Sequence, residues 1–140
     1  MNRMAFVLMW GTVVASAPTH AHHSLTEYDG SRRITVNVVV REFHFVNPHP
    51  YLVVDAPVSG RGTATQAWRL ELDNRFELVN IGMTSKTFNR GDQLTVTGAP
   101  GHDGKPILYV RELDRPGDGF RYEQVGNTPR IVRAGSGRQR

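Results

Sequence analysis

Alternating and β-branched apolar residues follow the first 33 positions of the chain and predict an all-β domain. Residues 34–46 are rich in Val, Ile, Phe and Thr, which is typical of a strand. Their apolar side chains change face near Arg41, which predicts a β-bulge or a sharp bend there. Trp68, Leu70 and Leu72 alternate with charged residues, as in a half-buried strand, and we expect Trp68 to belong to the core. Further strands are expected at 51–55, 94–97 and 107–113, with a short edge strand at 120–122.

One short helix is expected between the third and fourth strands. Asn74 is a favourable N-cap, Glu77 follows three residues later as in a capping box, and Gly82 suits the end of the helix. Three strands, a helix and two strands is the order of an OB-fold, a five-stranded Greek-key barrel. We therefore predict an all-β fold with one short helix, built as a small OB-like five-stranded β-barrel. A small β-sandwich is the alternative.

The first 21 residues have the features of an export signal. Arg3 supplies a positive charge, residues 5–17 are mostly apolar and uncharged, and Thr19-His20-Ala21 offers small residues at the −3 and −1 positions of a cleavage site. The apolar stretch is too short to span a bilayer, which favours a removed signal over an anchor. We expect a signal peptide at 1–21, a mature protein that begins at His22 without a membrane span, and a periplasmic or secreted location.

Charge and cysteine content narrow the possible functions. The 140 residues include no cysteine, which excludes disulfides and thiolate chemistry. The formal net charge is +4, yet residues 22–129 hold 12 Lys and Arg against 13 Asp and Glu. The basic excess lies in the C-terminal residues, so we expect a barrel domain at 22–125 and a basic, disordered tail at 126–140. No nucleic-acid partner is expected, because such a partner needs positive charge clustered on a folded face.

Histidines are the candidate metal ligands. Cleavage after Ala21 gives His22 a free α-amine beside its imidazole, and His23 adds a second imidazole. His49 lies in the loop after the first strand, where the barrel prediction makes it a possible companion of the other two. Nitrogen donors without thiolates suit Cu(II), Ni(II) or Zn(II), and Cu(II) is the favoured candidate. In the competing interpretation the terminal histidines are only solvated, and the segment Asn-Pro-His-Pro at 47–50 is a structural corner.

A metal-free binding function is also open. On an OB barrel the loops after the first and fourth strands frame the ligand face, which would bring Asn47 and Tyr51 toward His102, with Arg69 on a neighbouring strand. Such a surface would bind a small anionic ligand, an oligosaccharide or a protein partner.

Enzymatic motifs are not found in the sequence. It contains no Gly-x-Ser-x-Gly, no His-Glu-x-x-His and no phosphate-binding loop. Glu71 and Asp73 share one face of a predicted strand, and we expect them to be solvated carboxylates. The sequence therefore favours a binding protein, although an enzyme is not excluded.

Several short motifs occur in order along the chain. They are His22-His23-Ser24-Leu25, Tyr28-Asp29, Val46-Asn47-Pro48-His49, Trp68-Arg69-Leu70-Glu71-Leu72, Gly82 and Gly91-Asp92-Gln93-Leu94-Thr95-Val96-Thr97-Gly98. Together they resemble a family of small exported bacterial proteins described as a domain of unknown function. The resemblance covers about residues 21–113. It implies export, a small β-barrel and recurring histidines at His22, His23 and His49, and it implies no activity.

Overall fold

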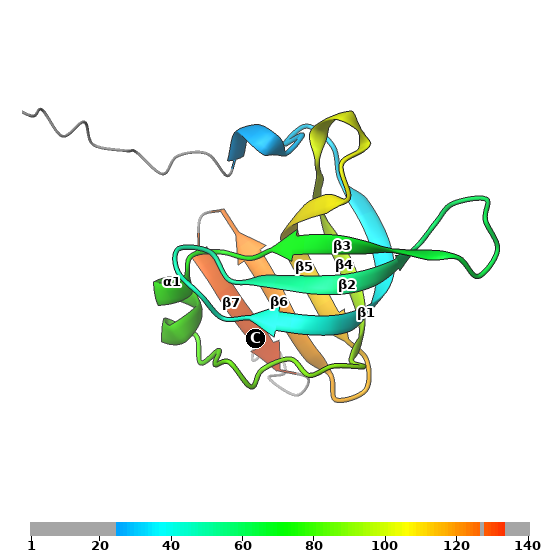
Figure 1. The fold of residues 1–140 in the computed structure, drawn as a ribbon. Coiled ribbons are helices and arrows are strands. Elements are labelled where there is room, and N and C mark those ends of the chain that lie inside the picture. The colour runs from blue at the N-terminus through cyan, green and yellow to red at the C-terminus, as the bar shows by residue number, and fades with distance from the viewer. Residues whose placement is uncertain (1–24, 127, 134–140) are drawn as a thin grey trace, which may run out of the picture.

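Seven strands form one continuous sheet that closes on itself (Figure 1). The computed structural model describes residues 25–126 and 128–133. The elements are η1 (Leu25–Glu27), β1 (Ile34–His44), β2 (Tyr51–Pro57), β3 (Thr65–Glu71), α1 (Arg75–Asn80), β4 (Gln93–Pro100), η2 (His102–Gly104), β5 (Ile107–Arg115), β6 (Phe120–Val125) and β7 (Thr128–Arg133). None of the described helices is long and apolar enough to cross a membrane.

The barrel closes through a parallel pairing between β3 and β5. The strand order is β3-β2-β1-β4-β5-β6-β7, and residues 69–71 of β3 also pair with residues 107–109 of β5. The first five strands are thus a closed barrel with OB topology, which confirms the predicted fold class and excludes the sandwich. The second half of β5 turns away from β3 and pairs with β6, so that β6 and β7 extend the sheet.

Two local features bend the long strands around the barrel. The register of β1 with β2 shifts between Val40 and Glu42, which confirms the bulge predicted near Arg41. After this bulge the side chain of Phe43, instead of that of Glu42, packs against the core. In β4, Gly98 lies so close to the backbone of β5 that a Cβ atom there would overlap a carbonyl group. Only glycine permits this approach of the two strands.

Inward-facing residues from all five barrel strands form the core. Leu52, Val54, Leu70, Val96 and Leu108 are completely buried. Such alternation of buried and outward residues is what the period-two pattern predicts. Partly buried Trp68 packs against the same cluster, as expected for a core residue.

The helix α1 lies at one end of the barrel (Figure 1) and inserts Leu78 into its core. The side chain of Asn74 accepts a hydrogen bond from the backbone N–H of Glu77 at 3.0 Å, which confirms the predicted N-cap. Gly82, with φ of +92°, follows the helix and lets the chain turn back toward the barrel. Sequence and structure therefore agree on this element and on both of its ends.

The sheet continues past the expected end of the domain. β6 runs to Val125 instead of ending at residue 122, and β7 pairs with it along its full length. The folded domain therefore continues beyond the expected boundary at residue 125 and includes β7. The basic composition of this segment suggested a tail, but Arg130 makes an ion pair with Glu123 of β6 on the surface of the sheet. Gly126, at the end of β6, has φ of +62°, a value that favours glycine.

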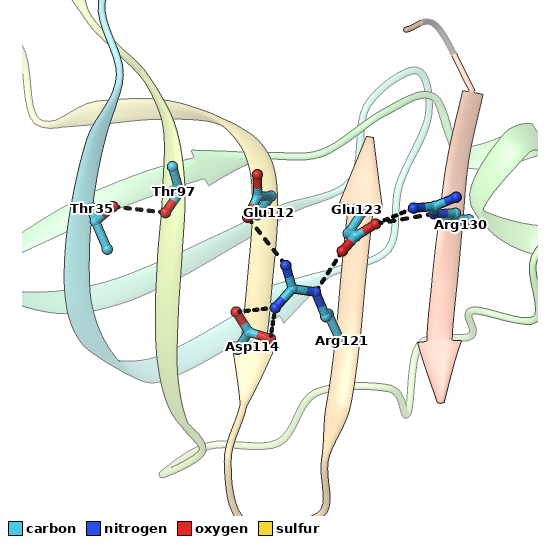
Figure 2. Close-up of polar contacts among 7 residues, drawn as sticks. All are labelled: Thr35, Thr97, Glu112, Asp114, Arg121, Glu123 and Arg130. Carbon is cyan, nitrogen blue, oxygen red and sulfur yellow. Dashed lines mark hydrogen bonds and ion pairs between the residues drawn. The ribbon is translucent and has the colours of Figure 1, made fainter. Parts of the chain in front are cut away.

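An ion-pair ladder crosses the outer face of β5, β6 and β7 (Figure 2). Arg121 lies 3.4 Å from Glu112, 3.2 Å from Asp114 and 2.6 Å from Glu123. Arg130 approaches the other oxygen of Glu123 at 2.6 Å. Hydrogen bonds from Arg130 and then from Arg121 hold the pKa of Glu123 below its ordinary value. The ladder thus links the two added strands to the barrel.

Replacement of Glu123 by Gln tests this ladder. A carboxyl group whose pKa is lowered by folding stabilises the protein above its unfolded pKa of about 4.3, and this contribution disappears as the pH falls below that value. We expect Glu123→Gln to lower the free energy of unfolding at pH 7 and to match the wild type more closely near pH 3, as measured by urea unfolding. Glu77→Gln, which removes a carboxylate without an ion pair in the described part of the chain, is the control. An equal effect of Glu123→Gln at both pH values would contradict the prediction.

Candidate functional site

Two buried carboxylates lie where β3 leaves the barrel toward α1. Glu71 is only 4 % exposed and Asp73 only 5 %. The expectation that both are solvated was wrong. Glu71 is the last residue of β3 and Asp73 lies two residues after it, but β5 lies beside that strand and tyrosine side chains cover both carboxylates. Burial of charge is costly unless hydrogen bonds compensate, so these two groups need specific partners.

Asp73 accepts hydrogen bonds from β5 and β6. The hydroxyl of Tyr109 donates at 2.7 Å, the hydroxyl of Tyr122 donates at 2.6 Å, and the amide of Gln124 is a third donor. Burial and the neighbouring carboxylate raise the pKa of both phenols, which keeps them protonated as donors. This cluster fastens β6 to the end of β3.

Glu71 connects three separate parts of the chain. Tyr28, which precedes β1, donates its hydroxyl to Oε2 of Glu71 at 2.9 Å, and burial followed by the charge of Glu71 raises the pKa of this phenol. Arg69 lies 3.6 Å from the same oxygen. His49, in the β1–β2 loop, has its Nδ1 atom 3.8 Å from the other oxygen, Oε1. Glu71 is therefore the centre of a polar cluster on the outside of the barrel.

The ring of His49 is oriented by the backbone. Its Nδ1 atom lies 3.2 Å from the carbonyl oxygen of Leu72, and its side chain is 27 % exposed. A carbonyl oxygen only accepts, so the neutral ring carries its hydrogen on Nδ1 and its lone pair on Nε2. Metal-bound histidines have this arrangement, with one ring nitrogen donating to a carbonyl or carboxylate and the other free to bind.

The segment around Tyr28 docks against the turn between β4 and β5 (Figure 1). Tyr28 forms an isolated β-bridge with Gly101, and the backbone N–H of Asp29 donates to the carbonyl of Pro100 at 2.8 Å. The ring of Tyr28 also packs against Tyr109, with 5.6 Å between ring centres. His22 and His23 lie outside the described residues, five or more positions before Tyr28.

A row of stacked side chains crosses β1, β2 and β3 beside this cluster. The ring of His44 stacks on Tyr51 with 4.5 Å between centres and 13° between planes. The guanidinium of Arg69 lies over the same tyrosine at 4.5 Å. Tyr51 and Arg69, both predicted as ligand-binding residues, are thus in direct contact, and Glu71 brings His49 close to Arg69.

The other two predicted ligand-binding residues lie apart from this row. Asn47 is exposed in the β1–β2 loop, where it precedes Pro48 in a cis peptide bond. His102 is exposed in η2. Within the described ranges, no hydrogen bond or ring contact joins either residue to Tyr51, Arg69 or His49. The sequence interpretation missed Tyr28 and Glu71, because only the closed barrel brings these two positions together.

The part of the chain that the structure describes contains no complete set of metal-binding side chains. No three His, Asp or Glu side chains there come close enough to share a metal ion. A metal ion on His49 would need ligands from outside this part of the chain, and the candidates from the sequence are the N-terminal histidines.

A cleft of about 470 Å³ lies away from the Glu71 cluster, between the loop before β4 and the β5–β6 turn. Arg115 crosses it and binds Asp92 at 2.7 Å and Asp118 at 2.8 Å. Its guanidinium also donates to the backbone carbonyl of Thr87. This arginine is therefore committed to internal contacts, and the cleft does not offer it to a ligand.

Residues 11–107 match the family of unknown function DUF6152. The chain belongs to this family. The matched range begins ahead of the described residues and ends at Ile107, the first residue of β5. It does not include β6 and β7 of this DUF6152 protein. No curated protein and no solved structure matches the chain.

Replacement of Tyr122 by Phe tests the Asp73 cluster. The change removes a buried donor and leaves one oxygen of Asp73 without that partner, which costs about 1–3 kcal/mol. We expect a loss of this size in the free energy of unfolding, measured by urea denaturation. Tyr51→Phe is the matched control, because the Tyr51 hydroxyl makes no hydrogen bond among the described residues. Equal stability of Tyr122→Phe and the wild type would show that this hydrogen bond contributes little to the free energy of unfolding.

Proposed function

We propose that this DUF6152 protein is an exported copper-binding module in which His22 and His23, at the mature N-terminus, bind Cu(II) together with His49. The observation that carries the proposal is the orientation of His49. Its Nδ1 atom is held at 3.2 Å from the Leu72 carbonyl, so that Nε2 is the nitrogen left for a metal.

The position of Tyr28 supports the participation of the N-terminus. Tyr28 is fixed on Glu71, whose second oxygen lies 3.8 Å from the ring of His49. An extended chain spans at most about 3.6 Å per residue, so the six steps from Tyr28 back to His22 can reach up to about 22 Å. The histidines of a mature N-terminus are therefore within reach of His49.

The donor types favour copper. The α-amine and the imidazole of His22 form a chelate, and His23 and His49 add imidazole nitrogens. Nitrogen donors in a tetragonal arrangement suit Cu(II), and Cu(II) binds such sites more tightly than the other divalent first-row metals. The proposed role is binding, and no catalytic step is assigned to the site.

A second candidate is a metal-free module that binds a small anion. The row formed by His44, Tyr51 and Arg69 favours it, because the Arg69 side chain is half exposed and stacks on Tyr51 through the face of its guanidinium. One guanidinium nitrogen lies 3.6 Å from Glu71, and the other donors on the edge suit a carboxylate.

Copper binding is tested on protein secreted with its own signal, whose N-terminus is first established by mass spectrometry. Cu(II) titration followed by electron paramagnetic resonance (EPR) should show a site with several nitrogen ligands. His49→Ala should weaken the affinity at least about tenfold, because it removes one of these ligands. His102→Ala is the matched control and should bind like the wild type. One extra residue before His22 should abolish tight binding, since it converts the α-amine into an amide.

Equal, weak binding by the native and extended forms, without nitrogen coupling in the EPR spectrum, would end the copper proposal. The second candidate has its own test, which is nuclear magnetic resonance titration with malonate as a small dicarboxylate probe. Shifts centred on Tyr51 in the metal-free protein, lost in Arg69→Ala, would support anion binding. Unchanged spectra would exclude it for this class of anion.

A further inference from the structure

The hydrogen bond between Tyr28 and Glu71 links the N-terminal segment to the barrel beside His49. We infer that these two residues form a clasp that positions the N-terminal segment for the metal site, and that clasp closure and metal binding strengthen each other. The inference rests on the proposed function. Tyr28 and Glu71 are positioning residues in it, because neither is a metal ligand.

Burial makes the clasp a specific contact. Tyr28 is 5 % exposed, Glu71 is similarly buried, and their oxygens are 2.9 Å apart. A buried phenol and a buried carboxylate each require a partner, so the contact is stable only when both are in place. Opening of the clasp would expose both groups to water.

Glu71 also connects the clasp to His49. Oε2 accepts from Tyr28, and Oε1 of the same carboxylate faces Nδ1 of His49 at 3.8 Å. Tyr28 and the ring of His49 therefore lie beside opposite oxygens of one side chain.

Comparison with the Asp73 cluster separates positioning from general stability. Tyr109 donates to Asp73 from β5, which is already paired with β3 and β4 in the sheet. Tyr28 belongs to a segment that meets the barrel through one isolated bridge, the hydrogen bond from Asp29 to Pro100 and the packing of the Tyr28 ring on Tyr109. Loss of the Tyr28 hydroxyl should therefore loosen this segment and leave the barrel closed.

Loop closure explains why the clasp and the metal are coupled. A metal ion shared by His22 and His49 closes a long loop, which costs conformational entropy. The clasp lowers this entropy cost, because it already holds the segment near His49 before the metal binds. Thermodynamic linkage then requires the metal to favour the closed clasp by the same factor.

A double-mutant cycle tests this coupling in protein that begins at His22. Cu(II) affinity is measured by competition with a chelator for the wild type, Tyr28→Phe, His49→Ala and the double variant. Tyr28→Phe should weaken binding about tenfold in the wild-type background and have no effect when His49 is absent. The same loss in both backgrounds, or no loss in either, would overturn the inference and leave copper binding itself intact.

Two further variants act as controls. Tyr109→Phe removes a phenol from the other buried carboxylate, so it should lower barrel stability without changing the copper affinity or the EPR spectrum. Glu71→Gln retains an oxygen that accepts from Tyr28 and should keep most of the wild-type affinity. Weaker copper binding by Tyr109→Phe would mean that barrel stability, rather than the clasp, controls the site.

Hydrogen exchange tests the clasp without copper. The amide of Asp29 donates to Pro100, so Tyr28→Phe should speed its exchange in the metal-free protein, and Cu(II) should slow it in the wild type. Unchanged exchange in Tyr28→Phe would refute the clasp even if copper binds. Failure of the wild type to bind Cu(II), with faster exchange in Tyr28→Phe, would refute the metal site and the coupling while showing that the contact holds the segment.

Discussion

The short parallel pairing of β3 with β5 is the constraint on which the rest of the structure depends. It closes the barrel through residues 69–71 and 107–109 alone. It also places β5 beside β3, so that Tyr109 of β5 reaches Asp73, which would otherwise meet water. Because the pairing ends after Tyr109, the remainder of β5 has a free edge, and β6 and β7 occupy it. Barrel closure, buried charge and the two added strands thus have one origin.

Local rules account for much of the fold. The β1 bulge at Arg41 follows from apolar residues that change face, and the cap at Asn74 follows from the residue types around the helix start. The order of elements was enough for the OB topology. Burial of Glu71 and Asp73 could not be predicted in this way, because their cover comes from Tyr28, Tyr109 and other residues distant in sequence. Of the candidate site, the sequence supplied His49, Tyr51 and Arg69 but not the carboxylate near them.

The Glu71 cluster lies within the range that matches the family, whereas the donors of the Asp73 cluster lie outside that range. Tyr28, His49, Arg69 and Glu71 all lie within residues 11–107, the part that matches DUF6152. The donors to Asp73 lie beyond it, on β5 and β6. The Glu71 cluster thus comes from the matched segment alone, and the Asp73 cluster depends on strands that follow it. This division separates the proposed metal site from the contacts that attach the C-terminal hairpin.

The position of β7 at the end of the strand order bears on how the protein avoids self-association. A terminal strand presents backbone groups to which another chain can add, and charged residues and prolines discourage such addition. In β7, Pro129 lacks a backbone donor, and Arg130 is an exposed cation held by Glu123. Arg130, one of the residues behind the expectation of a basic tail, thus helps to keep neighbouring molecules from joining their sheets.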